Sequence, residues 1–171
     1  MEPDFADLYR QFAPGVYRYL VRVCGSRLTA QDLLQETFLR LHLQLRQRAA
    51  IACPRPWLYR VAVHLARDHQ RASQRAALRD GRYARDERVV DFQAAVERQD
   101  AVAHALARLT PRMRQVLLLF AEGFTYREIA EIAGVEYGYV GVLMQRARAA
   151  FRRHYEDQDD RRSRIQPRAV R

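Results

Sequence analysis

The chain has 171 residues, enough for one ordinary domain or two small ones, and its 49% content of hydrophobic residues favours a folded protein. Its formal net charge is +10, carried by arginine without any lysine, so its surface suits phosphate groups and nucleic acid becomes the leading class of partner. No apolar run approaches the roughly 20 residues of a membrane span, and the N-terminus is too acidic and polar for a signal peptide, so we expect a cytoplasmic protein with no membrane insertion.

The two cysteines, Cys24 and Cys53, are too few for a disulfide framework and form no CxxC motif. The sequence therefore predicts two buried thiols, and a redox pair stays open as an alternative. A helical enzyme or metal protein that uses these thiols with His42, His64 and His69 is a further alternative, but no HExxH or paired-cysteine spacing brings such ligands together. We therefore expect no catalytic activity, no metal and no cofactor.

The N-terminal segment shows two helical patterns. The first opens after Pro3, continues past Pro14, where we predict a break, and ends at Gly25. The second follows Thr29, which forms a capping signal with Asp32, and its apolar face consists of Leu34, Phe38, Leu41 and Leu45. The polar side of this second helix carries Asp32, Gln35, Glu36 and Arg40. Such a row is either a solvated face or a docking surface.

The two prolines within residues 48–56 predict a loop, and a long helix is predicted to begin at Trp57. The buried side of this helix is expected to consist of Leu58, Val61, Ala62 and Leu65. A separate cationic stripe consists of Arg60, His64, Arg67, Arg71 and Arg75. Because Asp68 is the one acidic neighbour of this stripe, its charge has a single sign, which favours contact with nucleic acid.

Helical periodicity fades and charge becomes dense after this helix, which predicts a linker over residues 79–93. A second helical unit over 94–155 opens with an apolar pattern through Ala95, Val102, Leu106 and Leu109. Its next helix has Thr110 as the N-cap and Pro111 in the first helical position, with a core face of Met113, Val116, Leu117 and Phe120. The few apolar residues over 156–171 predict a disordered tail.

Two short helices around a tight turn are predicted between Thr125 and Phe151. Thr125 and Glu128 form a capping box, and Gly134 tolerates the turn conformation. The second helix has its apolar face at Val140, Leu143, Met144, Ala147 and Phe151. This pattern matches a helix-turn-helix, whose second helix enters the DNA major groove, and the arginines along it are placed for phosphates. An ordinary helical hairpin is the alternative.

Three stretches carry a family resemblance when they are taken in order: residues 32–38, residues 57–62, and residues 106–114 with 128–130 and 146–148. Together they resemble the extracytoplasmic function group of bacterial sigma-70 factors, up to residue 155. The resemblance implies an all-α fold of two small helical domains. A domain like sigma region 2 occupies residues 1–78, and a domain like sigma region 4 follows the flexible linker at 94–155.

The resemblance also implies an alternative sigma factor that binds core RNA polymerase, directs it to specific promoters and helps open the DNA. The implied partners are the beta and beta-prime subunits, promoter DNA and an anti-sigma factor. The docking set, which would contact polymerase, is Asp32, Gln35, Glu36 and Arg40. The minus-ten set is Trp57, Arg60, His64, Arg67 and Arg71. The minus-thirty-five set is Arg127, Tyr137, Tyr139, Gln145, Arg146, Arg148 and Arg152. A stand-alone helix-turn-helix regulator is the alternative function.

Two departures from the family pattern concern base reading. His64 stands where the family usually has asparagine, which changes the shape of the contact and makes it sensitive to pH. In the recognition helix, Gly141, Val142 and Leu143 follow Val140, where a basic residue, serine and arginine are common in the family. Fewer polar side chains therefore remain there for base edges.

Overall fold

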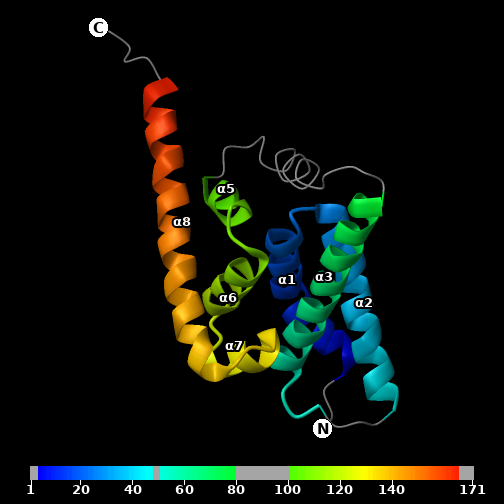
Figure 1. Ribbon diagram of the computed structural model, residues 1–171. Coiled ribbons are helices and arrows are strands. Elements are labelled where there is room, and N and C mark those ends of the chain that lie inside the picture. Colours follow the sequence, from blue (N-terminus) through cyan, green and yellow to red (C-terminus); the bar gives the residue numbers. More distant parts are fainter. Residues whose placement is uncertain (1–3, 48–50, 80–100, 166–171) are drawn as a thin grey trace, which may run out of the picture.

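The computed structural model describes residues 4–47, 51–79 and 101–165, and within them every regular element is an α-helix (Figure 1). The predicted all-α class is confirmed for this part of the chain. The N-terminal half contains α1 (Phe5–Cys24), α2 (Arg27–Arg46) and α3 (Pro54–Arg79). The C-terminal half contains α5 (Ala101–Ala107), α6 (Pro111–Ala121), α7 (Tyr126–Ala133) and α8 (Tyr137–Ile165). The predicted linker falls almost entirely on residues outside the described ranges.

Helix α1 runs through Pro14 without a break, so the predicted interruption is wrong. Pro14 lies on the exposed side, where water can reach the backbone carbonyl that the missing N–H leaves unpaired. Apolar residues on both sides of it, including Leu8 and Val16, are buried. Their packing holds the two segments in one helix despite the proline.

Helix α2 begins at Arg27, earlier than the capping signal at Thr29 predicts. Gly25 adopts a left-handed conformation with φ of 76° and ends α1, which leaves Ser26 in extended backbone to act as the N-cap. The Ser26 hydroxyl accepts a hydrogen bond from the N–H of Thr29 at 3.2 Å. Thr29 is therefore a residue of the first turn.

Helix α3 begins at Pro54, so its first turn includes residues that the sequence assigns to a loop. Proline is tolerated in the first turn because those N–H groups have no partner within the helix. The start at Trp57 is therefore a wrong prediction, and part of the predicted loop, residues 48–50, lies outside the described residues.

The C-terminal half confirms the predicted helix-turn-helix. The Thr125 and Glu128 side chains form the expected capping box, and Gly134 ends α7 with φ of 61°. Most of the predicted apolar face of α8 is buried, namely Val140, Leu143, Met144 and Ala147. Helix α8 packs on α5, α6 and α7, which fixes the angle at which the recognition helix is presented.

Helix α6 has the predicted cap, in which the Thr110 hydroxyl accepts a hydrogen bond from the N–H of Met113. Its predicted core face is partly wrong, because Phe120 is exposed whereas Leu118 and Leu119 are buried. The reason is that α6 packs against α8 on one side and against α1 and α7 on others, so its buried residues exceed one helical stripe.

Helix α8 continues to Ile165, so the prediction of a disordered tail from residue 156 is wrong over residues 156–165. Once a helix is nucleated by packing, each further residue adds a backbone hydrogen bond at little cost. Residues 166–171 lie outside the described part of the chain.

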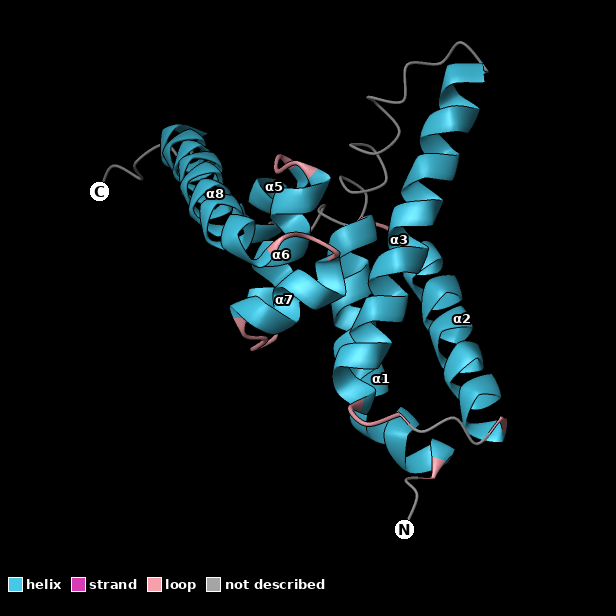
Figure 2. Ribbon diagram, turned by 60° about the horizontal axis from the view of Figure 1, so that its bottom comes forward, coloured by secondary structure: helices cyan, strands magenta, loops and turns pink. Residues whose placement is uncertain are grey.

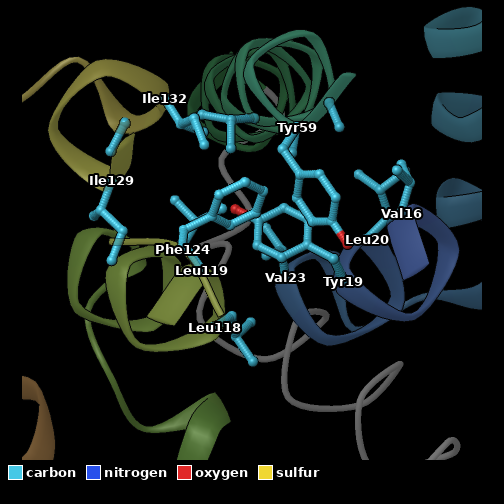
Figure 3. Packing of buried hydrophobic residues seen from close by; sticks show 14 of the residues in the cluster. Val16, Tyr19, Leu20, Val23, Tyr59, Leu118, Leu119, Phe124, Ile129 and Ile132 are labelled. Carbon is cyan, nitrogen blue, oxygen red and sulfur yellow. The ribbon is translucent and has the colours of Figure 1, made fainter. Parts of the chain in front are cut away.

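The two halves share one hydrophobic core. Helix α3 packs against α7, and α1 packs against α6 (Figures 1 and 2). Figure 3 shows Tyr19 and Tyr59 of the N-terminal half meeting Phe124 of the C-terminal half between the ribbons of α1, α3 and α6. All three rings are at most 2% exposed. The expected pair of helical units is therefore closed into one body, with α2 on the side that faces away from the C-terminal half.

The two cysteines lie in different environments. Cys24 is partly buried, and burial raises the pKa of its thiol to about 12. Cys53 is exposed, so the prediction of two buried thiols is wrong for this residue, which precedes the first turn of α3. Across the described helices, none combines the length and the apolar character that crossing a membrane requires.

We predict that replacing Phe124 with alanine destabilises the whole described body, because this ring is shared by both halves. Loss of a buried phenylalanine costs roughly 3 to 5 kcal/mol. Urea unfolding followed by circular dichroism measures this change. The control is Tyr137→Ala, which removes an aromatic ring that is 63% exposed and is expected to change stability by about 0.5 kcal/mol or less. Similar losses in the two variants would contradict the shared core.

Candidate nucleic-acid interface

The docking set lies together on the outer side of α2. Asp32, Gln35 and Arg40 are exposed and Glu36 is half-buried. The Arg40 Nε donates to Glu36 Oε1 at 2.8 Å, an i, i+4 ion pair between partly exposed side chains. Such a pair contributes little to stability in water, so these groups remain available for a partner.

Exposed leucines accompany this set, and the sequence analysis missed them. Leu28, Leu39 and Leu43 are 71%, 52% and 47% exposed. With Asp32 they fall at i, i+4, i+11 and i+15, which places them on one face of α2. Their helical spacing can be read from the sequence. It was overlooked because a second apolar row on the same helix, the one that faces the core, is more regular. The outer face of α2 thus combines apolar and charged groups.

The minus-ten set lies along α3, and the structure divides it. Trp57 is half-buried against the core, while Arg60, His64 and Arg71 are exposed. The His64 ring holds Nδ1 at 2.7 Å from the Arg60 carbonyl oxygen, which orients the imidazole along its own helix. The predicted stripe is therefore present on one helix, but its members differ in accessibility.

Two arginines of this set are engaged by the helix-turn-helix. The Arg67 Nη2 donates to the Ala133 carbonyl at 2.7 Å, at the C-terminal end of α7. This carbonyl has no partner within its own helix and carries part of the negative end of the helix dipole. Arg60 Nη2 lies 3.8 Å from Glu131 Oε2 of the same helix. The cationic stripe is therefore partly neutralised by α7, whereas the sequence analysis gave Asp68 as its one acidic neighbour.

Arg55 makes the same kind of contact at the start of α3. Its guanidinium donates to the carbonyl of Glu122, the C-cap of α6, and lies 4.2 Å from the centre of the Phe124 ring. Beside it the Tyr59 hydroxyl donates to Glu122 Oε2 at 2.8 Å, and the Tyr59 and Phe124 rings meet edge to face at 4.8 Å. Burial and the Glu122 carboxylate raise the pKa of Tyr59, so its hydroxyl stays a donor.

Arg114 joins the halves from the other side. Its guanidinium donates to the carbonyls of Leu106 and Ala107 at the end of α5, of Leu109 just after it, and of Val23 near the end of α1. Arg55, Arg67 and Arg114 thus each bind carbonyls at helix C-termini across the boundary between the halves. We call this set the seam arginines. The sequence analysis missed this role, because arginine spacing gives no sign of a distant carbonyl.

The minus-thirty-five set lies on the helix-turn-helix, away from the seam. All of its members are exposed: Arg127, Tyr137, Tyr139, Gln145, Arg146, Arg148 and Arg152. Arg148 lies 4.7 Å from the centre of the Phe120 ring, which holds its guanidinium against α6. Val142 is also exposed, as a base-facing residue of this helix would be. The recognition helix therefore presents its polar side chains to solvent in the closed body.

The first helix of the helix-turn-helix, α7, is capped at its N-terminus. Glu128 Oε2 accepts hydrogen bonds from the N–H and from the hydroxyl of Thr125, each at 2.8 Å. These bonds hold the pKa of Glu128 below its usual value. Among the described residues, no three histidine, cysteine or acidic side chains lie together in a way that could hold a metal ion. This includes the cysteines and histidines that the sequence analysis considered as ligands.

The chain is similar to known members of the sigma-70 family. Residues 8–76 match the family model of sigma-70 region 2, and residues 99–151 match that of sigma-70 region 4. The chain is 34% identical over 139 residues to the ECF RNA polymerase sigma factor SigC of Mycobacterium tuberculosis, covering 77% of this chain and 72% of SigC. It is 30% identical over 164 residues to SigE of Mycolicibacterium smegmatis, but it spans only 61% of the length of SigE.

A solved structure shares the fold. It is that of the sigma factor RpoE in complex with the anti-sigma factor NepR from Bartonella quintana, with a TM-score of 0.74 and 20% identity. The match covers 90% of this chain and 97% of RpoE. At this identity the comparison concerns the arrangement of the helices.

We predict that the seam arginines stabilise the closed body. Arg55→Ala removes a charged donor from the Glu122 carbonyl and a cation from the Phe124 ring, and a hydrogen bond to a charged group contributes roughly 1.5 to 3 kcal/mol. The control is Arg75→Ala on the same helix, whose exposed side chain donates a hydrogen bond to the carbonyl of Arg71 within its own helix. Urea unfolding of both variants measures the difference. Equal stabilities would show that the Arg55 contact contributes nothing.

Proposed function

Because the chain belongs to the extracytoplasmic function group of sigma-70 family RNA polymerase sigma factors, we propose that it is an alternative sigma factor of the cytoplasm. In this role it binds core RNA polymerase, directs it to specific promoters and helps open the DNA, without catalysing a reaction itself. One observation supports the proposal: a single chain holds a solvent-facing recognition helix in α8, a basic row on α3 and an exposed face of apolar and charged residues on α2.

The outer face of α2 is the proposed docking surface for the beta and beta-prime subunits. Exposed leucines beside Asp32, Gln35 and Glu36 give it an apolar centre with a charged rim, which is the usual anatomy of a protein interface. The face also points away from the C-terminal half, so docking does not require the halves to separate.

The basic row of α3 is the proposed contact with the minus-ten element. Opening a duplex requires unpaired bases to be held, at a cost of a few kcal/mol for each base. His64 supplies a hydrogen-bonding ring for such a base, and Arg60, Arg67 and Arg71 supply charge for the backbone. Because Arg67 is bound to the end of α7, full use of this row requires α7 to move away from α3.

The recognition helix α8 is the proposed contact with the minus-thirty-five element. Gln145 and Arg146 are its polar side chains best suited to base edges, with Tyr137 and Tyr139 beside them. Arg127, Arg148 and Arg152 suit phosphates. This surface is exposed in the closed body, which supports initial binding to duplex DNA before the halves separate.

An anti-sigma factor is the proposed regulatory partner. The structural relative RpoE is described in complex with the anti-sigma factor NepR. A partner of this kind acts on the present chain by covering the α2 face or by holding the halves together. The alternative, a stand-alone regulator, is favoured only by the exposed recognition helix and the net charge of +10.

The direct test is run-off transcription. We expect core RNA polymerase to start at new sites on genomic DNA when this protein is added, and sequencing of the transcripts identifies them. Co-purification with core polymerase separates the two candidate functions, because a stand-alone regulator does not form that complex. No new start site on any promoter would contradict the proposal.

The docking surface is tested by charge reversal. We expect the Gln35→Arg, Glu36→Arg double variant to fold normally and to bind core polymerase more weakly by about 2 to 5 kcal/mol if the contacts are buried in the complex. A control is Gln74→Arg, at an exposed glutamine on α3 outside the docking face; it adds one positive charge, whereas the double variant raises the net charge by three. Isothermal titration with core enzyme measures both. Unchanged affinity of the double variant would show that this face is merely solvated.

The recognition helix is tested by separating base contacts from phosphate contacts. Arg146→Ala is expected to relax sequence preference, because a good base contact contributes roughly 1 to 3 kcal/mol of discrimination. Arg152→Ala is expected to weaken binding to all sequences alike. It is also expected to reduce the slope of log affinity against log salt concentration by about one unit. Binding of duplexes with varied minus-thirty-five elements, at several salt concentrations, distinguishes these outcomes. Equal weakening of every sequence by Arg146→Ala would remove its base-reading role.

A further inference from the structure

A cavity of about 170 Å³ lies on the seam, between α1, α3 and α6. One water requires roughly 10 to 15 Å³, so the space is large enough for a small ligand. Its walls come from both halves: Tyr19, Val23, Val63, Ala66, Arg67, Gln70, Arg71, Pro111, Arg112 and Gln115. Because Arg71 and Arg112 are exposed, the cavity opens to solvent on their side.

The charge around this cavity has a single sign. Arg67 and Arg71 reach it from α3 and Arg112 reaches it from α6, and among the described residues of its lining there is no aspartate or glutamate. Burial, followed by the positive charges of Arg112 and Arg71, lowers the pKa of Arg67, and Asp68 offsets this effect only in part. Three guanidinium groups that repel one another are stabilised by a bound anion.

Tyr19 forms part of the wall of the same cavity, and its hydroxyl is buried. Tyr19 is 1% exposed, and within the described part of the chain its Oη has no hydrogen-bond partner. The Gln115 side chain partly offsets the effect of burial on the pKa of this hydroxyl. Burial raises the pKa of Tyr19, so the hydroxyl keeps its proton and is available as a donor. Figure 3 shows the Tyr19 ring reaching from α1 into the space beside α3 and α6.

The N-terminal end of α6 contributes a further positive potential. Pro111 and Arg112 are the first residues of this helix and both line the cavity. The aligned peptide dipoles place partial positive charge at this end, where anions bind favourably. The cavity therefore combines three arginines, a helix N-terminus and an unpartnered buried hydroxyl.

We propose that this seam cavity binds a small anion that carries a phosphate or pyrophosphate group, as in free pyrophosphate or a nucleotide. Arg67, Arg71 and Tyr19 bind it from the N-terminal half and Arg112 from the C-terminal half, so the ligand bridges the two halves and favours the closed body. While the anion is bound, Arg67 and Arg71 are not available to promoter DNA. This regulatory consequence rests on the proposed function.

The test is a calorimetric titration of the full chain with sodium pyrophosphate, without polymerase or promoter, so its failure is independent of failure in transcription. We expect binding to the unaltered protein and at least about tenfold weaker binding to Arg112→Gln, since a charged donor contributes that factor or more. Tyr19→Phe removes only the hydroxyl and is expected to weaken binding about threefold to tenfold. The control, Arg108→Gln, removes the same charge from an exposed residue outside the cavity and is expected to change binding less than about twofold.

Several results would overturn the proposal. One is the absence of pyrophosphate binding at millimolar concentration. Another is equal weakening by Arg112→Gln and Arg108→Gln, which would show general attraction to the cationic surface. A third is binding of a DNA duplex that depends on Arg112 without any binding of pyrophosphate, which would assign the cavity to the DNA backbone. Unchanged pyrophosphate binding by Tyr19→Phe would show that the buried hydroxyl does not contact the ligand.

Discussion

The closed body depends on arginine side chains that cross from one half to the other and bind the exposed carbonyls at helix ends. Arg55 reaches the end of α6, Arg67 the end of α7, and Arg114 the ends of α5 and α1. A helix leaves its last carbonyls without partners, and the planar guanidinium offers several donors in a fixed geometry, so one residue satisfies carbonyls that apolar packing would leave unpaired. Between these polar contacts, the rings of Tyr59 and Phe124 exclude water.

This arrangement links stability to function because one of these residues, Arg67, also belongs to the basic row of α3. In the closed body it neutralises the end of α7, and on a promoter it is expected to face the DNA backbone, so the two states compete for the same charge. The α2 face and the recognition helix remain outside this competition. Under the proposed function, polymerase and duplex DNA bind first, and their binding energy is available to separate the halves.

Local signals in the sequence predicted the elements well and the relation between the halves poorly. The capping box at Thr125, the turn at Gly134 and the cap at Thr110 act within a few residues, so each was visible without the structure. The contact of Tyr59 with Glu122 joins positions 63 residues apart and leaves no periodic trace. The break predicted at Pro14 failed for a related reason, because burial on both sides of the proline outweighs its local cost. In the candidate site, the basic row was predicted, whereas its neutralisation by α7 depends on tertiary packing.

The most direct test of this account is the distance between the two halves in solution, measured by pulsed electron resonance between spin labels. Cys53 is exposed in the N-terminal half and Ala149 is exposed on α8, so labels at Cys53 and at Ala149→Cys, in a Cys24→Ala background, report on the seam. The account predicts one narrow distance distribution in the free protein, broadened by Arg55→Ala and shifted to longer distances when core polymerase and promoter DNA are added. A broad distribution in the unaltered free protein, insensitive to Arg55→Ala, would contradict it.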